Sequence, residues 1–94
     1  LIKRLFMKTK IVILTPVYND WNNLGKLLKK INKVFEVSIN NTFDLVIVND
    51  CSKENYNHKK YKLKMINKII LINLEKNVGS QRAIAIGLKY LKKN

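Results

Sequence analysis

Three short stretches of this sequence carry polar side chains of types that bind ligands. They comprise residues 15–23, 49–55 and 74–82, and each follows an apolar run. The first stretch contains Pro16 and Tyr18. A tyrosine ring offers a flat face on which a nucleobase can stack, and proline fixes the backbone beside it. The first stretch is therefore a candidate contact surface for a flat, aromatic ligand.

The second stretch contains Asp50 directly after an apolar run. A carboxylate at that position can accept hydrogen bonds from a ribose hydroxyl or a base N–H. Aspartate and serine side chains also cap turns and helices. The residues alone leave both roles of Asp50 open.

The third stretch runs through Asn77, Gly79 and Arg82 into a segment with helical periodicity. Unpaired N–H groups and the positive end of the helix dipole favour an anion such as a phosphate at a helix start. Arg82 is one of two arginines in the chain. The alternative for Gly79 is that it simply permits a tight turn.

Several other kinds of site are missing from the sequence. The first stretch matches neither the G-x-G-x-x-G dinucleotide pattern nor the P-loop pattern. Cys51 is the single cysteine, which rules out an internal disulfide, and it has no histidine partner with a nucleophile signature. The lone His58 lies in a polar segment. We therefore expect neither a metal site nor catalytic residues within this chain.

Apolar periodicity predicts the elements that position the three stretches. Continuous apolar runs predict strands covered on both faces at residues 10–15, which Pro16 should end, and at 43–49 and 69–73. A helix should begin between residues 20 and 23. Its expected buried stripe consists of Leu24, Leu27, Leu28, Ile31 and Phe35.

The remaining segments complete a β-α-β-(α)-β-α order. Residues 38–42 are expected to form a turn, the vaguer segment 56–68 a short helix around Tyr61 and Met65, and residues 80–91 a helix. Alternating strands and helices predict an α/β fold with a parallel sheet and right-handed crossovers. We expect strand order 3-2-1, with the outer edge of the first strand open. Ligands bind at the C-terminal ends of such strands, so the three polar stretches should meet there.

The charge balance suggests a second type of partner. The 94 residues include 19 Lys and Arg but only 6 Asp and Glu, a net charge of +13. Such a charge favours a small basic protein that binds nucleic acid or an anionic membrane surface. Nearly all of the cations are lysines, whereas nucleic-acid readers rely more on arginine. We therefore expect a solvated lysine surface, no specific nucleic-acid partner, and some preference for anionic ligands or lipid head groups.

The ends of the chain and its hydropathy indicate how it is divided into domains. Residues 1–9 are expected to form a basic N-terminal extension, and residues 10–94 part of one domain. No apolar run reaches the roughly 20 residues of a membrane-spanning helix. Because the chain ends on a helix with no following strand, we expect it to be the front part of a larger, C-terminally truncated domain.

Three motifs taken together resemble a known family. Residues 12–20, 45–52 and 77–87 are similar, in order and spacing, to the N-terminal nucleotide-binding half of family 2 glycosyltransferases. The last motif looks most like members that transfer sugars to polyprenyl phosphates. The resemblance implies a partial GT-A fold, a Rossmann-like three-layer sandwich, and a nucleotide-diphosphate sugar, UDP- or GDP-linked, as donor.

The resemblance also implies donor-site residues by position. They are Pro16, Tyr18, Asn19, Asp50, Asn77, Gly79 and Arg82. The proline and the tyrosine would line the base, and Asn19 would support their loop. The aspartate would contact the base or the ribose. The glycine and the arginine would lie near the base or the phosphates, with Asn77 ordering the turn.

The sequence departs from the family pattern at two loop positions and in one motif. Asn49 and Cys51 stand where the family more often has Asp and Gly, and no D-x-D metal motif occurs. The resemblance implies Mg²⁺ or Mn²⁺ for the complete family domain. We therefore expect a donor-binding part that is inactive alone, in a cytoplasmic protein working at the inner face of the membrane. The acceptor would be a polyprenyl phosphate or a glycan of the cell envelope, and the remaining alternative is a nonfunctional fragment.

Overall fold

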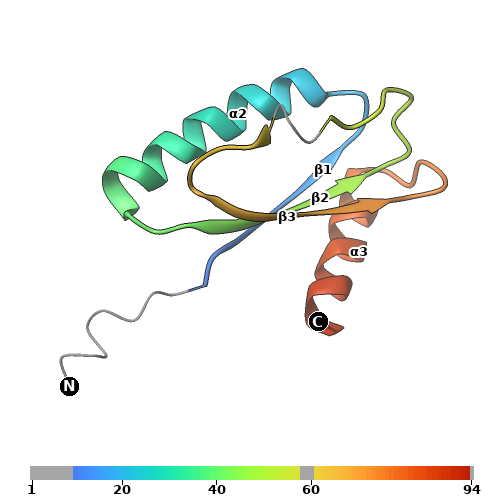
Figure 1. The fold of residues 1–94 in the computed structure, drawn as a ribbon. Coiled ribbons are helices and arrows are strands. Elements are labelled where there is room, and N and C mark those ends of the chain that lie inside the picture. The colour runs from blue at the N-terminus through green and yellow to red at the C-terminus, as the bar shows by residue number, and fades with distance from the viewer. Residues whose placement is uncertain (1–9, 58–60, 94) are drawn as a thin grey trace.

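The computed structural model describes residues 10–57 and 61–93, so the predicted basic extension at residues 1–9 lies outside the described residues. Its elements are β1 (Val12–Val17), α2 (Trp21–Val34), the π-helical turn η1 (Phe35–Ile39), β2 (Phe43–Asn49), β3 (Ile66–Asn73) and α3 (Ser80–Lys93). The three strands form one parallel sheet in the order β1-β2-β3, which is the predicted order. Helix α2 covers one face of the sheet and α3 the other, giving three layers (Figure 1).

The main core lies between α2 and the sheet. Trp21, Leu24 and Leu28 of α2 are buried there. They pack with Leu45 and Ile47 of the central strand, which are fully buried. The predicted stripe is correct except at Leu27, whose side chain is 51% exposed. Leu27 lies at the border of the apolar stripe, where it lines a hollow beside the end of β1 instead of entering the core.

The prediction that Pro16 ends the first strand is wrong, because β1 continues through Pro16 to Val17. The carbonyl of Ile11 accepts a hydrogen bond from Asp44 of β2, and that of Val17 from Asp50 directly after β2. In a parallel strand, alternate residues direct their backbone groups to the same side, so the odd-numbered residues of β1 face β2. Pro16 therefore faces the open edge of the described sheet, where its missing N–H removes no ladder hydrogen bond.

Three other predicted boundaries differ from the structure. Strand β3 starts at Ile66, three residues before the expected start. The predicted turn at residues 38–42 begins later, because η1 carries the helical backbone through Ile39 and ends at Asn40 in a left-handed conformation. The described residues of the segment 56–68 contain no α-helix. Buried Tyr61 and Met65 fill that side of the core from irregular backbone instead.

Helix α3 approaches the sheet closely at Gly87. A methyl group on Gly87 would lie 2.5 Å from Leu14 Cδ1 and 2.9 Å from Val48 Cγ2. Favourable carbon contacts lie at about 3.5–4.0 Å. The missing side chain therefore sets the distance between α3 and the sheet, and with it the position of the loop that precedes α3.

We expect Gly87→Ala to lower the free energy of unfolding by about 1–3 kcal/mol, because the added methyl overpacks the helix–sheet contact. Gly25→Ala is the matched control. Gly25 lies within α2, and a methyl group added to it would lie 3.4 Å from Tyr61 Cε1. In the control variant the free energy of unfolding should stay unchanged or rise by up to about 1 kcal/mol, because alanine has the higher helix propensity. Urea unfolding followed by circular dichroism measures both; equal stability of the two variants would contradict the close packing at Gly87.

Candidate functional site

The three polar stretches lie together at the C-terminal ends of the strands, as predicted. In Figure 1 the loops that follow β1, β2 and β3 gather at one end of the sheet. The loop after β2 forms hydrogen bonds with both of the others. This loop is the central support of the candidate site.

Asn19 connects the first loop to the second. Its backbone N–H donates to Ser52 Oγ over 2.9 Å, and its Oδ1 accepts from the Lys53 N–H over 2.7 Å. Asn19 has a φ of 53°, a left-handed conformation that asparagine tolerates better than most residues. The sequence placed Asn19 in a supporting position but could not identify its partners, which lie more than 30 residues away.

Asp50 connects the second loop to the third. Its Oδ1 accepts from the Val78 N–H over 2.7 Å and its Oδ2 from the Gly79 N–H over 2.9 Å. The residue is only 2% exposed, and its own N–H donates to the Val17 carbonyl. Of the two roles that the sequence left open, the capping role is therefore present in the structure. Each carboxylate oxygen keeps a second lone pair, so contact with a ligand remains a prediction.

The third loop is held at Asn77 and turns at Gly79. Asn77 Nδ2 donates to the Asp50 carbonyl over 3.1 Å. Gly79 has a φ of 92°, which side-chain-bearing residues rarely adopt, and its carbonyl accepts the Ala83 N–H at the start of α3. Arg82 lies exposed in the first turn of α3. The carboxylate of Asp50 therefore already sits at this helix start, where the dipole favours negative charge.

Pro16 and Tyr18 border a small hollow beside the first loop. It has a volume of about 220 Å³, and Thr15, Val17, Asp20, Asn23, Leu24 and Leu27 also line it. The Tyr18 side chain is 49% exposed. A half-exposed ring at the mouth of a hollow is available for stacking, which is what the sequence predicts for Tyr18.

Sequence reasoning missed a second row of supporting groups. Asn49 Nδ2 donates to Asn73 Oδ1 over 2.9 Å, and Asn49 Oδ1 accepts from the Ser52 N–H over 3.0 Å. Asn49 and Asn73 are register partners at the ends of β2 and β3. The sequence does show an asparagine at the end of each of these two strands, but only the strand register reveals that the two asparagines are partners.

Cys51 occupies a left-handed backbone position, with a φ of 63°. Its Sγ lies 3.4 Å from the Glu75 carbonyl, toward which the thiol donates. A residue with a Cβ pays about 1–2 kcal/mol for this conformation, whereas glycine does not. The positive φ gives a physical reason for the glycine that the family more often has at this position.

An aromatic cluster fixes the start of α2 against the second loop. Trp21 Nε1 donates to the Glu54 carbonyl over 3.1 Å, and the Tyr61 hydroxyl donates to the Trp21 carbonyl over 2.7 Å. Burial raises the pKa of Tyr56 and of Tyr61 above the ordinary value of 10.0, with a smaller further rise from Tyr61 on Tyr56 and from Glu54 on Tyr61. Both hydroxyls therefore stay neutral near pH 7, and buried Trp21 packs against both tyrosine rings.

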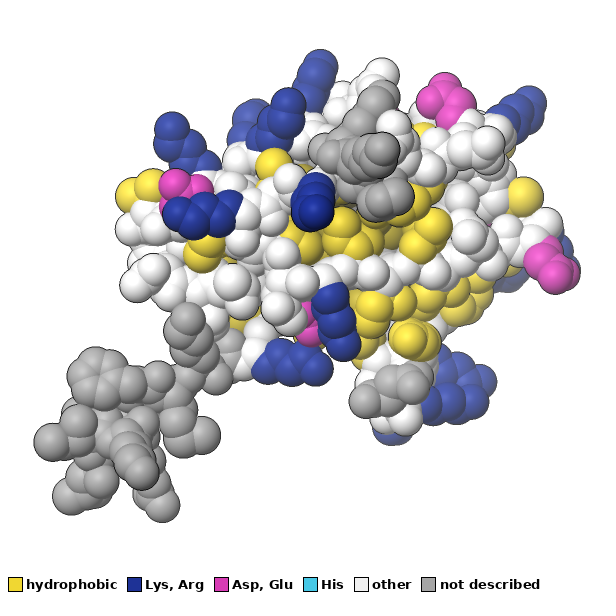
Figure 2. Space-filling view, viewed as in Figure 1, with side chains coloured by type: hydrophobic (Ala, Val, Ile, Leu, Met, Phe, Trp, Pro, Cys, Tyr) yellow, Lys and Arg dark blue, Asp and Glu magenta, His cyan; other side chains and the backbone are white. Residues whose placement is uncertain are grey.

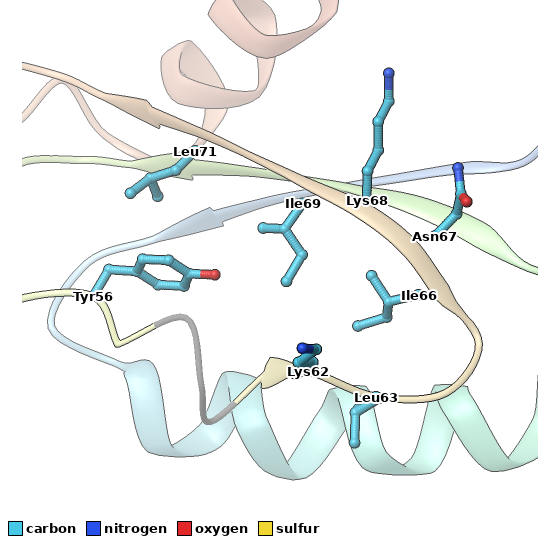
Figure 3. A pocket seen from close by; sticks show the side chains of 8 residues that line it. All are labelled: Tyr56, Lys62, Leu63, Ile66, Asn67, Lys68, Ile69 and Leu71. Atoms are coloured by element: carbon cyan, nitrogen blue, oxygen red, sulfur yellow. The ribbon is translucent and has the colours of Figure 1, made fainter.

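A larger hollow, of about 610 Å³, lies on the α2 side of β3 (Figure 3). Its walls are mostly apolar side chains, those of Tyr56, Leu63, Ile66, Ile69 and Leu71. It contains none of the seven residues predicted for the donor site. Size alone therefore does not locate the candidate site, which is defined by the polar loops.

The resemblance implies Mg²⁺ or Mn²⁺ for the complete family domain, and clustered acidic, histidine or cysteine side chains would be the usual ligands. Residues 10–57 and 61–93 contain no group of three or more His, Cys, Asp and Glu side chains that could hold a metal ion. At the candidate site the carboxylate of Asp50 is engaged by two backbone N–H groups. No reaction step through a metal follows from these residues.

Comparison with known proteins supplies the family. The model of the family described as glycosyl transferase family 2 matches residues 12–94. An uncharacterized glycosyltransferase of Synechocystis sp. is 28% identical over 89 residues, which cover 94% of this chain but 28% of the relative's length. No solved structure matches the chain. With a family match over nearly all described elements, the chain belongs to glycosyl transferase family 2.

Proposed function

We propose that the three loops at the C-terminal end of the sheet bind the nucleotide part of a UDP- or GDP-linked sugar, for transfer to an acceptor. The observation that carries this proposal is the bonding of the loop after β2 to the loops on either side. These bonds bring Tyr18, Asp50 and Arg82 to one end of the sheet from three separate segments. A preorganised set of loops lowers the cost of ordering a site when a ligand binds.

In the proposal the base lies at the first loop. The exposed ring of Tyr18 provides the stacking face, and Pro16 forms the rigid border of the same hollow. Asp50 reaches the base or the ribose only through the lone pairs that Val78 and Gly79 leave free. Its direct contribution to binding is thus secondary to its support of the third loop.

The diphosphate lies beside the first turn of α3. The N–H groups of Ser80, Gln81 and Arg82 have no partner within the helix, and the guanidinium of Arg82 is exposed beside them. The N–H groups of Val78 and Gly79 are already taken by Asp50. A phosphate is therefore expected at residues 80–82 and not at the turn itself, with Asn77 and Gly79 shaping the approach.

The proposal also names an acceptor and a place of action, which go beyond the family assignment. The acceptor is proposed to be a polyprenyl phosphate or a glycan of the cell envelope, and the place of action the cytoplasmic face of the membrane. The part of the chain that the structure describes has no helix long and apolar enough to cross a bilayer. Contact with the membrane would accordingly be peripheral for these residues.

Titration calorimetry with UDP and with GDP, each with and without Mn²⁺, tests the donor proposal. We expect weak binding that Mn²⁺ leaves unchanged, because the described residues hold no cluster of metal ligands. Tyr18→Ala should weaken binding by about 1–3 kcal/mol through loss of stacking, whereas Tyr18→Phe should retain most of the affinity.

The control ligand is inorganic diphosphate, which has the charge of the nucleotide but no base. If inorganic diphosphate binds as tightly as UDP and GDP, the lysine-rich surface binds anions without recognising a base, and the proposal fails. A strong gain in affinity with Mn²⁺ would contradict the expected metal independence.

A further inference from the structure

Four lysines form one row on the outer side of α2. Lys26, Lys29, Lys30 and Lys33 have the spacing i, i+3, i+4, i+7, which places them on one side of a helix. All four are exposed, on the side of α2 that faces away from the sheet. Figure 2 shows lysine and arginine side chains projecting along this border of the molecule.

The row is electrostatically unbalanced. Neighbouring like charges at i+3 and i+4 destabilise a helix, and the row contains four such pairs. Within the part of the chain that the structure describes, none of these lysines forms an ion pair, and the one acid on their side is exposed Glu36 of η1, three residues after Lys33. Binding to an anionic surface would relieve this repulsion.

Exposed apolar side chains continue the row toward η1. Val34 is 52% exposed and Val37 71%. Val34 and Val37 lie four residues after Lys30 and Lys33, so along the helix they follow the charged side chains directly. A basic helix surface that ends in exposed aliphatic residues has the composition of helices that lie in a membrane interface.

We propose that this lysine face, which comprises Lys26, Lys29, Lys30, Lys33, Val34 and Val37, docks on the surface of an anionic phospholipid bilayer. The lysines interact with the lipid phosphates, and the aliphatic side chains enter the headgroup region. Helix α2 then lies along the membrane, with the sheet behind it and α3 on the far side (Figure 1).

The composition of the lysine face favours lipid over nucleic acid. It has no arginine, the residue that forks onto phosphate and guanine, and no aromatic ring on which a base could stack. Exposed valines gain nothing from contact with a phosphate backbone. They gain from transfer out of water into a lipid interface.

Sedimentation with vesicles of phosphatidylcholine, with and without phosphatidylglycerol, tests the proposal. The test variant carries Lys26→Gln, Lys30→Gln and Lys33→Gln. The matched control carries Lys89→Gln, Lys92→Gln and Lys93→Gln on α3. Both variants reduce the net charge of +13 by three. Unfolding curves of each, measured beforehand, show that the fold is kept.

We expect binding to vesicles only when phosphatidylglycerol is present. The α2 variant should bind at least about tenfold more weakly than the parent, given the contribution of each lysine near an anionic surface. The α3 variant should change by less than about threefold, because its lysines lie on the opposite side of the sheet. Val37→Ser should weaken vesicle binding without changing the net charge.

Two results would overturn the proposal. Equal losses in the α2 and α3 variants would mean that only net charge matters. Tighter binding to an RNA or DNA oligonucleotide than to the anionic vesicles, lost in the α2 variant, would assign the face to nucleic acid instead.

Discussion

Replacing Asp50 by alanine is expected to lower the free energy of unfolding by about 3 kcal/mol or more and to remove detectable nucleotide binding. The substitution deletes the acceptors for the Val78 and Gly79 N–H groups. Hydrogen bonds to a charged group contribute about 1.5–3 kcal/mol each. The loop that precedes α3 loses its anchor at the same time, so the side of the site near Arg82 is no longer held in place.

Asp20→Ala is the matched control for this substitution. Asp20 is exposed, makes no side-chain cap to the helix backbone, and accepts a hydrogen bond from Asn23 Nδ2. Its loss should cost less than about 1 kcal/mol. Urea unfolding and amide hydrogen exchange at Val78 and Gly79 measure the effects. Unchanged stability and unchanged exchange in Asp50→Ala would contradict the role given to this carboxylate.

The 94-residue chain alone is expected to show no sugar transfer above background. Enzymes lower reaction barriers by at least about 8 kcal/mol. For the departing diphosphate, the candidate site offers the start of α3 and the exposed Arg82. An exposed cation and an exposed helix end contribute about 1 kcal/mol each. The buried carboxylate of Asp50 is held by two backbone N–H groups, which leaves it poorly placed to take a proton from an acceptor hydroxyl.

The assay follows radiolabelled sugar from UDP-glucose and GDP-mannose into polyprenyl phosphate or sugar acceptors. The control is Asp50→Ala, which removes the carboxylate of the candidate site. Transfer by the parent chain that disappears in this variant would show that these residues suffice for catalysis, contrary to the prediction.

The sheet could be predicted from the sequence because its signals are local. Three β-branched runs identified the strands, and the alternation with helices fixed a parallel sheet. The predicted end of the first strand at Pro16 was wrong, because the effect of a proline depends on which side of the strand forms hydrogen bonds with its neighbour. That side is set by pairing with β2, which no local pattern records. The predicted burial of Leu27 was wrong because this residue lies at the border of the apolar stripe, where spacing alone does not decide burial.

The sequence located the residues of the candidate site, but it did not identify their hydrogen-bond partners. Strand ends placed Asn19, Asp50 and Asn77 at one edge of the sheet. The bonds that they form join residues 27 to 34 positions apart in the sequence. Such contacts depend on loop geometry, including the positive φ angles at Asn19, Cys51 and Gly79. For Asp50 the sequence therefore left capping and ligand contact equally open, and the structure was needed to show the capping bonds.

The most direct test of the account is a map of where the nucleotide binds. Backbone amide NMR spectra of the chain, recorded during titration with UDP and GDP, provide this map. The account predicts shift changes that gather at residues 15–23, 49–55 and 74–82, of which those at residues 15–23 are absent with phosphate alone. Changes that instead gather on the lysines of α2, or around the hollow beside β3, would contradict a nucleotide site at the C-terminal end of the sheet.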